Sequence, residues 1–123
     1  MRSAVPQLSV QDLAGFIAEQ AARHPADQPT NQPVLLDVRE AWELQTARLD
    51  LPGATTLHIP MHTLPARLHE LRRTQPTLGL CHHGARSWQC VAFLQMQGFE
   101  AVYNVAGGID AWSREVDHQV PRY

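Results

Sequence analysis

Residues 80–87 read Leu80-Cys81-His82-His83-Gly84-Ala85-Arg86-Ser87, and they join a short apolar run, Leu78 to Cys81, to a helical pattern, Ser87 to Gln97. Gly98 follows that pattern directly, as glycine commonly does after the last residue of a helix. A strand that passes through a tight loop into a helix is the repeating unit of an α/β domain.

The same alternation continues through the rest of the chain. Val34-Leu35-Leu36-Asp37-Val38 is a short run without apolar–polar alternation, which is typical of a strand covered on both faces of a parallel sheet. We expect strands at Val34–Val38, Thr55–Ile59, Leu78–Cys81 and Ala101–Val105, and helices at Val10–Ala22, Ala41–Thr46, Leu64–Leu71, Ser87–Gln97 and Gly108–Glu115. The sequence therefore predicts a single α/β domain with a mostly parallel sheet flanked by helices on both faces.

The N-terminal part should supply one helix and one exposed loop. Ser9, followed by Gln11 and Asp12, resembles a helix N-cap with acidic support in the first turn. Residues 23–33 combine prolines with small polar residues and predict a loop without a domain boundary. A chain of 123 residues with 44% hydrophobic content has the size of one domain, so we expect a single domain over 1–123 with its core at about 8–115.

Composition excludes several classes of function. Twelve acidic and ten basic residues give a net charge of −2 without a basic run, so we expect no nucleic-acid partner. All ten basic residues are Arg, which excludes a Schiff-base lysine and a phosphate-loop lysine. No apolar stretch is long enough to span a membrane, and no signal peptide is recognisable. With two cysteines, the chain is expected in a reducing compartment, the cytoplasm, and not at a membrane.

Cys81 is the candidate nucleophile, because ligands of open α/β sheets bind beyond the carboxyl ends of the strands. There it should face backbone N–H groups of the loop and the positive end of a helix dipole, which stabilise a thiolate and can hold an anion. Gly84 permits a tight turn, and Arg86 can add a planar donor fork for an oxyanion. A cysteine buried only for packing is the alternative, but the neighbouring glycine, arginine and helix start favour chemistry. Cys90, inside the following helix, is expected in the core, with a bridge to Cys81 as the minor alternative.

Three motifs follow one another in a specific order. They are Leu36-Asp37-Val38-Arg39-Glu40, Cys81-His82-His83-Gly84-Ala85-Arg86-Ser87 and Tyr103-Asn104-Val105-Ala106-Gly107-Gly108-Ile109-Asp110-Ala111-Trp112. Together they resemble the rhodanese homology domain, over roughly Leu8 to Trp112. The resemblance implies the rhodanese fold, a persulfide on Cys81, and sulfur transfer from donors such as thiosulfate to acceptors such as cyanide or another thiol.

One stretch departs from the family pattern. Where relatives commonly show Gly-His-Ile-Pro-Gly-Ala, this chain has Ala47-Arg48-Leu49-Asp50-Leu51-Pro52-Gly53-Ala54, which lacks the histidine and is longer. The packing before Thr55 should therefore differ from that of relatives, whereas the cysteine loop is unaffected.

Other polar residues near the predicted site are expected to have mainly structural roles. Asp37 and Arg39 should form an ion pair or cap a helix, and the alternative is that Arg39 contributes to the field around Cys81. Glu40 and Glu43 are expected on an exposed helical face. His82 and His83 either move protons or point outward while their N–H groups bind the anion.

The remaining features are expected to shape the fold. Gly107 and Gly108 should form a tight turn into a short helix and not a phosphate loop, which would require a lysine. Trp112 is expected in the core, while Trp42 and Trp88 either line the approach to the site or bury area. The tail 116–123 carries no chemical signature.

We therefore expect a sulfurtransferase in which Cys81 is catalytic and a six-residue segment binds the substrate: His82, His83, Gly84, Ala85, Arg86 and Ser87. No metal or other cofactor is expected, since the histidines His58, His62, His69 and His118 lack zinc-site spacing. The expected partners are a small sulfur donor and a thiol or cyanide acceptor, or a sulfur-accepting protein.

Two alternatives remain open. The first is a protein-bound sulfur-relay module. The second is a cysteine-dependent phosphatase or arsenate reductase, whose loops also hold tetrahedral oxyanions. Cysteine phosphatases of similar fold place five residues between nucleophile and arginine, whereas four separate Cys81 from Arg86.

Overall fold

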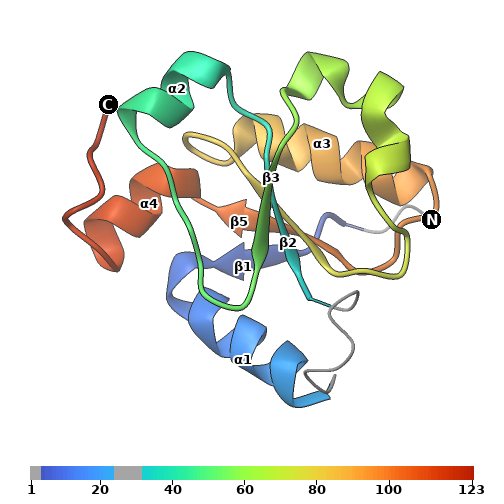
Figure 1. Cartoon of the computed structure of the whole chain (residues 1–123), viewed down its shortest axis with the longest axis horizontal. Coiled ribbons are helices and arrows are strands. Elements are labelled where there is room, and N and C mark those ends of the chain that lie inside the picture. Colours follow the sequence, from blue (N-terminus) through green and yellow to red (C-terminus); the bar gives the residue numbers. More distant parts are fainter. Residues whose placement is uncertain (1–3, 24–31) are drawn as a thin grey trace.

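A computed structural model describes residues 4–23 and 32–123 of the chain (Figure 1). Its centre is a five-stranded sheet in the order β1-β5-β4-β2-β3, and every neighbouring pair of strands is parallel. The strands are β1 (Gln7–Ser9), β2 (Val34–Asp37), β3 (Thr55–His58), β4 (Thr77–Leu80) and β5 (Val102–Ala106). The predicted α/β fold is confirmed.

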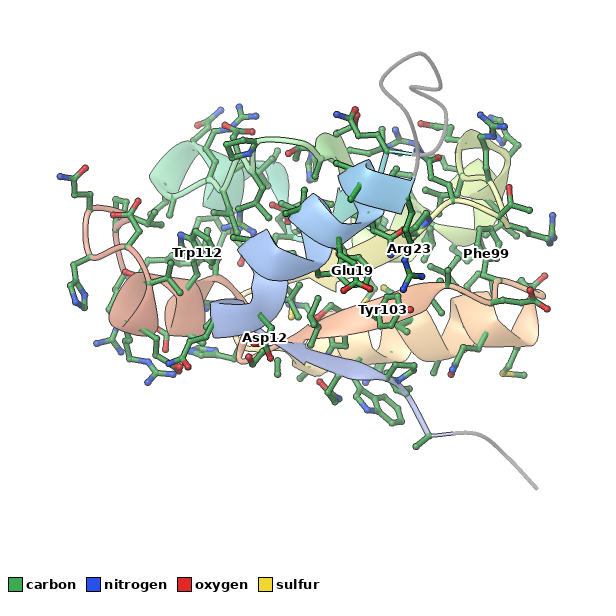
Figure 2. The ribbon with its side chains drawn as sticks, turned by 90° about the horizontal axis from the view of Figure 1, so that it is seen from below. Asp12, Glu19, Arg23, Phe99, Tyr103 and Trp112 are labelled. Carbon is green, nitrogen blue, oxygen red and sulfur yellow. The ribbon has the colours of Figure 1, made fainter. Side chains whose placement is uncertain are left out.

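Helices cover both faces of the sheet. One layer contains α3 (Ala85–Met96) and the 3-10 helices η3 (Met61–Thr63) and η4 (Pro65–Glu70), and the other contains η1 (Val10–Asp12), α1 (Leu13–Arg23) and α4 (Gly108–Glu115). The seventh helical segment of the described residues is α2 (Ala41–Thr46). Figure 2 shows α1 crossing its face of the sheet, with Trp112 and Tyr103 beside it.

Alternating strand residues build two hydrophobic cores, one on each face. Leu36 of β2 packs toward Val91 and Leu94 of α3, whereas Leu35 packs toward Leu13 and Ile109 on the opposite face. Every residue of β2 and β4 is buried because both faces of the sheet are covered, which explains why the apolar run of β2 shows no alternation.

Several elements of the structure differ from the predicted ones. The expected helix Leu64–Leu71 is the 3-10 segment η4, and Arg67 (φ −111°) has a non-helical backbone within it. The short strand β1 was not predicted, and most of the predicted loop 23–33 lies outside the described residues. The Ser9 hydroxyl does not cap a helix N–H group but donates to the Asp12 carboxylate at 3.0 Å.

The stretch that departs from the family pattern contributes to the core. Ala47, Leu49 and Leu51 are all buried in the cluster beneath α1. Gly53, at φ +86°, forms the turn before β3 and approaches the Ile17 side chain. No helix of the described residues has the length and apolar character needed to cross a membrane.

Parallel strands bring their carboxyl ends to one edge of the sheet. At this edge Arg39 follows β2, Cys81 follows β4 and Gly107 follows β5. In Figure 1 the loop between β4 and α3 lies at this edge, with α2 on one side and α4 on the other.

Candidate functional site

The Cys81 thiol lies beneath the first turn of α3. Its Sγ accepts hydrogen bonds from the backbone N–H groups of Gly84 (3.0 Å) and Ser87 (3.4 Å), and Ser87 Oγ lies at 3.2 Å. Cys81 is only 1% exposed. Because α3 begins at Ala85, the sulfur lies at the positive end of the helix, as the sequence predicts.

The turn before α4 holds the cysteine loop from the other side. The N–H groups of Ile109 and Asp110 donate to the carbonyl oxygens of Cys81 (2.9 Å) and His82 (3.0 Å). A Cβ on Gly108 would lie 2.5 Å from both oxygens, and Gly108 has φ +64°. The predicted tight turn is therefore confirmed, and it leaves no space for a side chain at this position.

Gly84 meets a similar constraint within the cysteine loop. It has φ +102°, and a Cβ there would lie 3.1 Å from the Gly107 backbone nitrogen. Gly84 therefore forms the predicted tight turn, and the two glycine turns approach each other closely. The close approach of the Gly84 backbone to a ligand stays a prediction.

Arg86 is paired with a buried carboxylate. Its Nη1 and Nη2 groups each donate to Glu43 at 2.8 Å. Glu43, only 3% exposed, also accepts from the Glu40 N–H at 2.9 Å and the Tyr123 hydroxyl at 2.7 Å. These donors, Arg86 above all, lower the pKa of Glu43 from 4.5 to about 2, while Glu43 raises the pKa of Arg86. The guanidinium N–H groups that the sequence predicts to bind an oxyanion are thus hydrogen-bonded to Glu43.

Arg39 has the expected structural role. It is fully buried, and it donates from Nε and Nη2 to the two oxygens of Asp37 at 2.9 and 2.7 Å. Its Nη1 also donates to the Tyr123 hydroxyl at 3.0 Å. Burial and the Glu43 carboxylate raise the pKa of Tyr123 to about 12, so the hydroxyl remains a donor to Glu43.

The two loop histidines differ in exposure. His83 is exposed, whereas His82 is half-buried in a stack between His83 and Tyr123, with both ring centroids at 3.8 Å. Burial lowers the pKa of His82, which favours the neutral imidazole. Its buried Nε2 has no hydrogen-bond partner among the described residues.

Within the described residues, one group combines three side chains of metal-binding type: His82, His83 and Asp110. The two Asp110 oxygens already accept from Arg114 Nε at 2.9 Å and Arg122 Nε at 3.0 Å. Because two arginines occupy this carboxylate, we assign no metal to the group.

Ser87 belongs to a second buried network. Its hydroxyl lies 2.5 Å from Oδ1 of Asn104 on β5, and the Asn104 amide nitrogen donates to the Gly84 carbonyl at 3.0 Å and to Gln7 Oε1 at 3.1 Å. Cys81, Ser87 and Asn104 are each at most 2% exposed. Ser87 therefore links the sulfur to a fixed carboxamide.

A pocket of about 490 Å³ adjoins the cysteine loop on the side of β5. Gly84, Ala85, Asn104 and Trp88 contribute to its lining. Trp42 is exposed and packs edge-on against Tyr123, and Trp112 is buried as predicted. Trp88 is thus the tryptophan beside the loop.

Cys90 is a core residue, as predicted. It is 3% exposed in the cluster that also contains Cys81, and both cysteines are free thiols. Burial raises the pKa of Cys90 to about 11, so this thiol remains protonated near neutral pH.

Sequence reasoning missed three residues of the site. The prediction that Glu43 lies on an exposed face is wrong, because its carboxylate turns inward to Arg86 and Tyr123. The capping pattern Glu40-x-x-Glu43 was an available signal for an oriented carboxylate. Asn104, a polar residue within a buried strand, was a second signal. Tyr123 gave none, and the tail 116–123, which carries no chemical signature in the sequence, supplies this residue to the network around Glu43.

Comparison with known proteins places this geometry in a family. Residues 18–115 match the Rhodanese-like domain. This chain belongs to the rhodanese-like family. A sulfurtransferase of Allochromatium vinosum is 39% identical over 85 residues, which cover 69% of this chain and 76% of the relative. The thiosulfate sulfurtransferase GlpE of Vibrio cholerae is 32% identical over 68% of this chain and 74% of the relative.

A solved structure supports the same assignment. The rhodanese-related protein of Thermoplasma volcanium superposes with a TM-score of 0.69 at 27% identity, over 90% of this rhodanese-like chain and 93% of the other. Two other matches are parts of longer proteins, since the chain spans 30% of a rhodanese-like relative from Arabidopsis thaliana and 18% of a Bacillus anthracis structure. The matched residues 18–115 include Cys81, Glu43 and Asn104 but not Tyr123.

Proposed function

We propose that this rhodanese-like domain transfers a sulfane sulfur from a thiosulfate-like donor to a thiol or cyanide acceptor through a persulfide on Cys81. The observation that carries the proposal is the position of Cys81 Sγ, which accepts hydrogen bonds from the N–H groups of Gly84 and Ser87 at the start of α3. Backbone N–H groups in this arrangement stabilise a sulfur anion without a metal or organic cofactor.

The proposed reaction consists of two displacements. In the first, the Cys81 thiolate attacks the outer sulfur of thiosulfate, a new S–S bond forms, and the S–S bond of the donor breaks with its electron pair leaving on sulfite. In the second, a thiolate or cyanide attacks the outer sulfur of the persulfide, and Cys81 leaves as the thiolate. No external oxidant or reductant is consumed.

Within this proposal, the segment from His82 to Ser87 binds the transferred sulfur mainly through its backbone. Gly84 and Ser87 supply N–H groups, Ala85 is the first residue of α3, and His82 and His83 lie within the loop before Gly84. The Arg86 charge is balanced by Glu43, so we assign Arg86 to holding the loop against α2.

Cys81→Ser and Cys90→Ser test the proposal as a matched pair. Formation of thiocyanate from thiosulfate and cyanide is measured for both variants and for the unaltered chain. We expect Cys81→Ser to abolish turnover, because a serine hydroxyl is not ionised at neutral pH and forms no persulfide, and Cys90→Ser to retain it. Turnover by Cys81→Ser would remove Cys81 as the nucleophile.

The sulfur-relay alternative makes a different prediction for the same proteins. A relay module would accept sulfur onto Cys81 but return it slowly to cyanide or small thiols. Persulfide formation together with negligible thiocyanate formation would therefore favour a protein as the acceptor.

A further inference from the structure

The hydrogen-bond partners of Asn104 fix the orientation of its carboxamide. The Gly84 carbonyl can only accept a hydrogen bond, so the group that faces it at 3.0 Å must be the Asn104 amide nitrogen. Oδ1 therefore faces Ser87 Oγ at 2.5 Å. Because Oδ1 has no proton to give, the Ser87 hydroxyl must be the donor in this hydrogen bond.

Ser87 has one hydroxyl proton and two neighbours that can accept it. Two oxygens approach to 2.5 Å only with a proton between them, and Asn104 Oδ1 has none, so the hydroxyl proton lies in this contact. The 3.2 Å between Oγ and Cys81 Sγ suits a hydrogen bond in either direction, because sulfur is the larger atom. The lone pairs of Oγ then face the sulfur. This arrangement suits a thiol, whose S–H can donate to Oγ, and it opposes a thiolate, which needs a donor at the same place.

We propose that Asn104 is a positioning residue that sets the direction of the Ser87 hydroxyl: toward Asn104 while Sγ is protonated, and toward Sγ when Sγ becomes a thiolate. On ionisation the sulfur proton passes to water, the hydroxyl rotates, and its bond to Oδ1 is exchanged for a bond to sulfur. Because of Asn104, ionisation of Cys81 therefore requires the loss of one buried hydrogen bond, that between the Ser87 hydroxyl and Oδ1. No covalent bond changes in this rotation.

Several other ionisable groups surround Cys81 and contribute to its field. Arg86 interacts with it from α3 and is balanced by Glu43 of α2, and Cys90 interacts with it from within α3. His82 and His83 adjoin it in the loop. Substitution of Asn104 leaves all five side chains in place, but it also removes the hydrogen bond to the Gly84 carbonyl, so the effect of the hydroxyl is isolated by repeating the substitution without Ser87 Oγ.

The test is the pH profile of Cys81 alkylation by iodoacetamide, measured on the full chain, with peptide mass spectrometry to assign the modified cysteine. Asn104→Leu removes Oδ1 and frees the Ser87 hydroxyl for the sulfur. We expect the midpoint of the profile to fall by about half to one pH unit, the equivalent of one ordinary hydrogen bond. If Asn104→Leu does not fold, Asn104→Ala removes the same oxygen.

Two controls separate this role from a purely structural one. Gln7→Ala removes the other acceptor of the Asn104 amide and should leave the midpoint unchanged. In a Ser87→Ala background, Asn104→Leu should have no effect on the midpoint, because no hydroxyl remains to rotate. An unchanged or raised midpoint in Asn104→Leu, or an equal shift in the Ser87→Ala background, would overturn the inference.

The inference rests on the proposed function in treating Cys81 as the nucleophile, but its test needs no sulfur donor. A shifted alkylation profile in a protein that forms no persulfide would leave the inference standing and overturn the proposed function. If the protein forms a persulfide but its alkylation profile is unchanged by substitution of Asn104, the inference is overturned and the proposed function stands.

Discussion

Replacement of Glu43 by glutamine should change how the stability of the domain depends on pH. Glu43 is 3% exposed and accepts from Arg86, Tyr123 and the Glu40 N–H, and its pKa is lowered from 4.5 to about 2. At about 1.4 kcal/mol per pKa unit this corresponds to about 3 kcal/mol. Arg86 is 36% exposed, so water screens part of the attraction, and we expect about 2 kcal/mol.

The direction follows from the lowered pKa. Glu43 contributes its stabilisation while it is ionised in both folded and unfolded chains, which is the case above about pH 4.5. The contribution is lost as the pH falls toward 2, where the folded protein also binds the proton. Glu43→Gln has no such proton to bind, so its stability should lack this part of the acid dependence.

Urea denaturation at pH values from 7 to 2 measures the effect. The free energy of unfolding of the unaltered chain minus that of Glu43→Gln should be largest near pH 7 and shrink by about 2 kcal/mol toward pH 2. Glu100→Gln, which changes an exposed glutamate, is the matched control and should show a nearly constant difference. A constant difference for Glu43→Gln as well would refute the electrostatic role of the Glu43–Arg86 pair.

Three further predictions concern the cysteine loop. Arg86→Ala should reduce sulfur transfer from thiosulfate and from an uncharged sulfur donor by similar factors in steady-state assays, because Glu43 engages both Nη groups of Arg86. A selective loss with thiosulfate would instead identify Arg86 as the group that binds thiosulfate. Gly108→Ala should destabilise the domain by more than about 1 kcal/mol in urea denaturation, since its Cβ would meet two backbone oxygens at 2.5 Å, whereas Gly15→Ala in α1 should be neutral or stabilising. Equal effects of the two substitutions would contradict the close contact between Gly108 and the cysteine loop. The unaltered chain should hydrolyse aryl phosphates negligibly, and insertion of one residue between Ala85 and Arg86 should shift binding toward phosphate. Efficient Cys81-dependent hydrolysis by the unaltered chain, without persulfide formation, would favour the phosphatase alternative.

The sequence alone predicts those parts of the molecule that depend on local patterns. Runs such as Val34–Val38 identify the buried strands because both faces of the sheet are covered. The position of Cys81 follows from a strand, a glycine turn and a helix start that are adjacent in the chain. Helices α2 and α4 have the predicted bounds, Ala41–Thr46 and Gly108–Glu115.

The parts that were not predicted depend on contacts between distant segments. Tyr123 reaches Glu43 across 80 positions of the chain, and no periodicity records such a contact. The inward turn of Glu43 depends on Arg86, 43 positions away. Strand β1 is only three residues long and forms by pairing with β5, so its own pattern is too short to identify it.

Exposure to thiosulfate followed by intact-mass measurement tests the central claim most directly. We expect the unaltered chain and Cys90→Ser each to gain the mass of a single sulfur atom, which cyanide or a reducing thiol then removes, and Cys81→Ser to gain nothing. A sulfur adduct on Cys81→Ser, or no adduct on the unaltered chain at any thiosulfate concentration, would contradict a persulfide carried by Cys81.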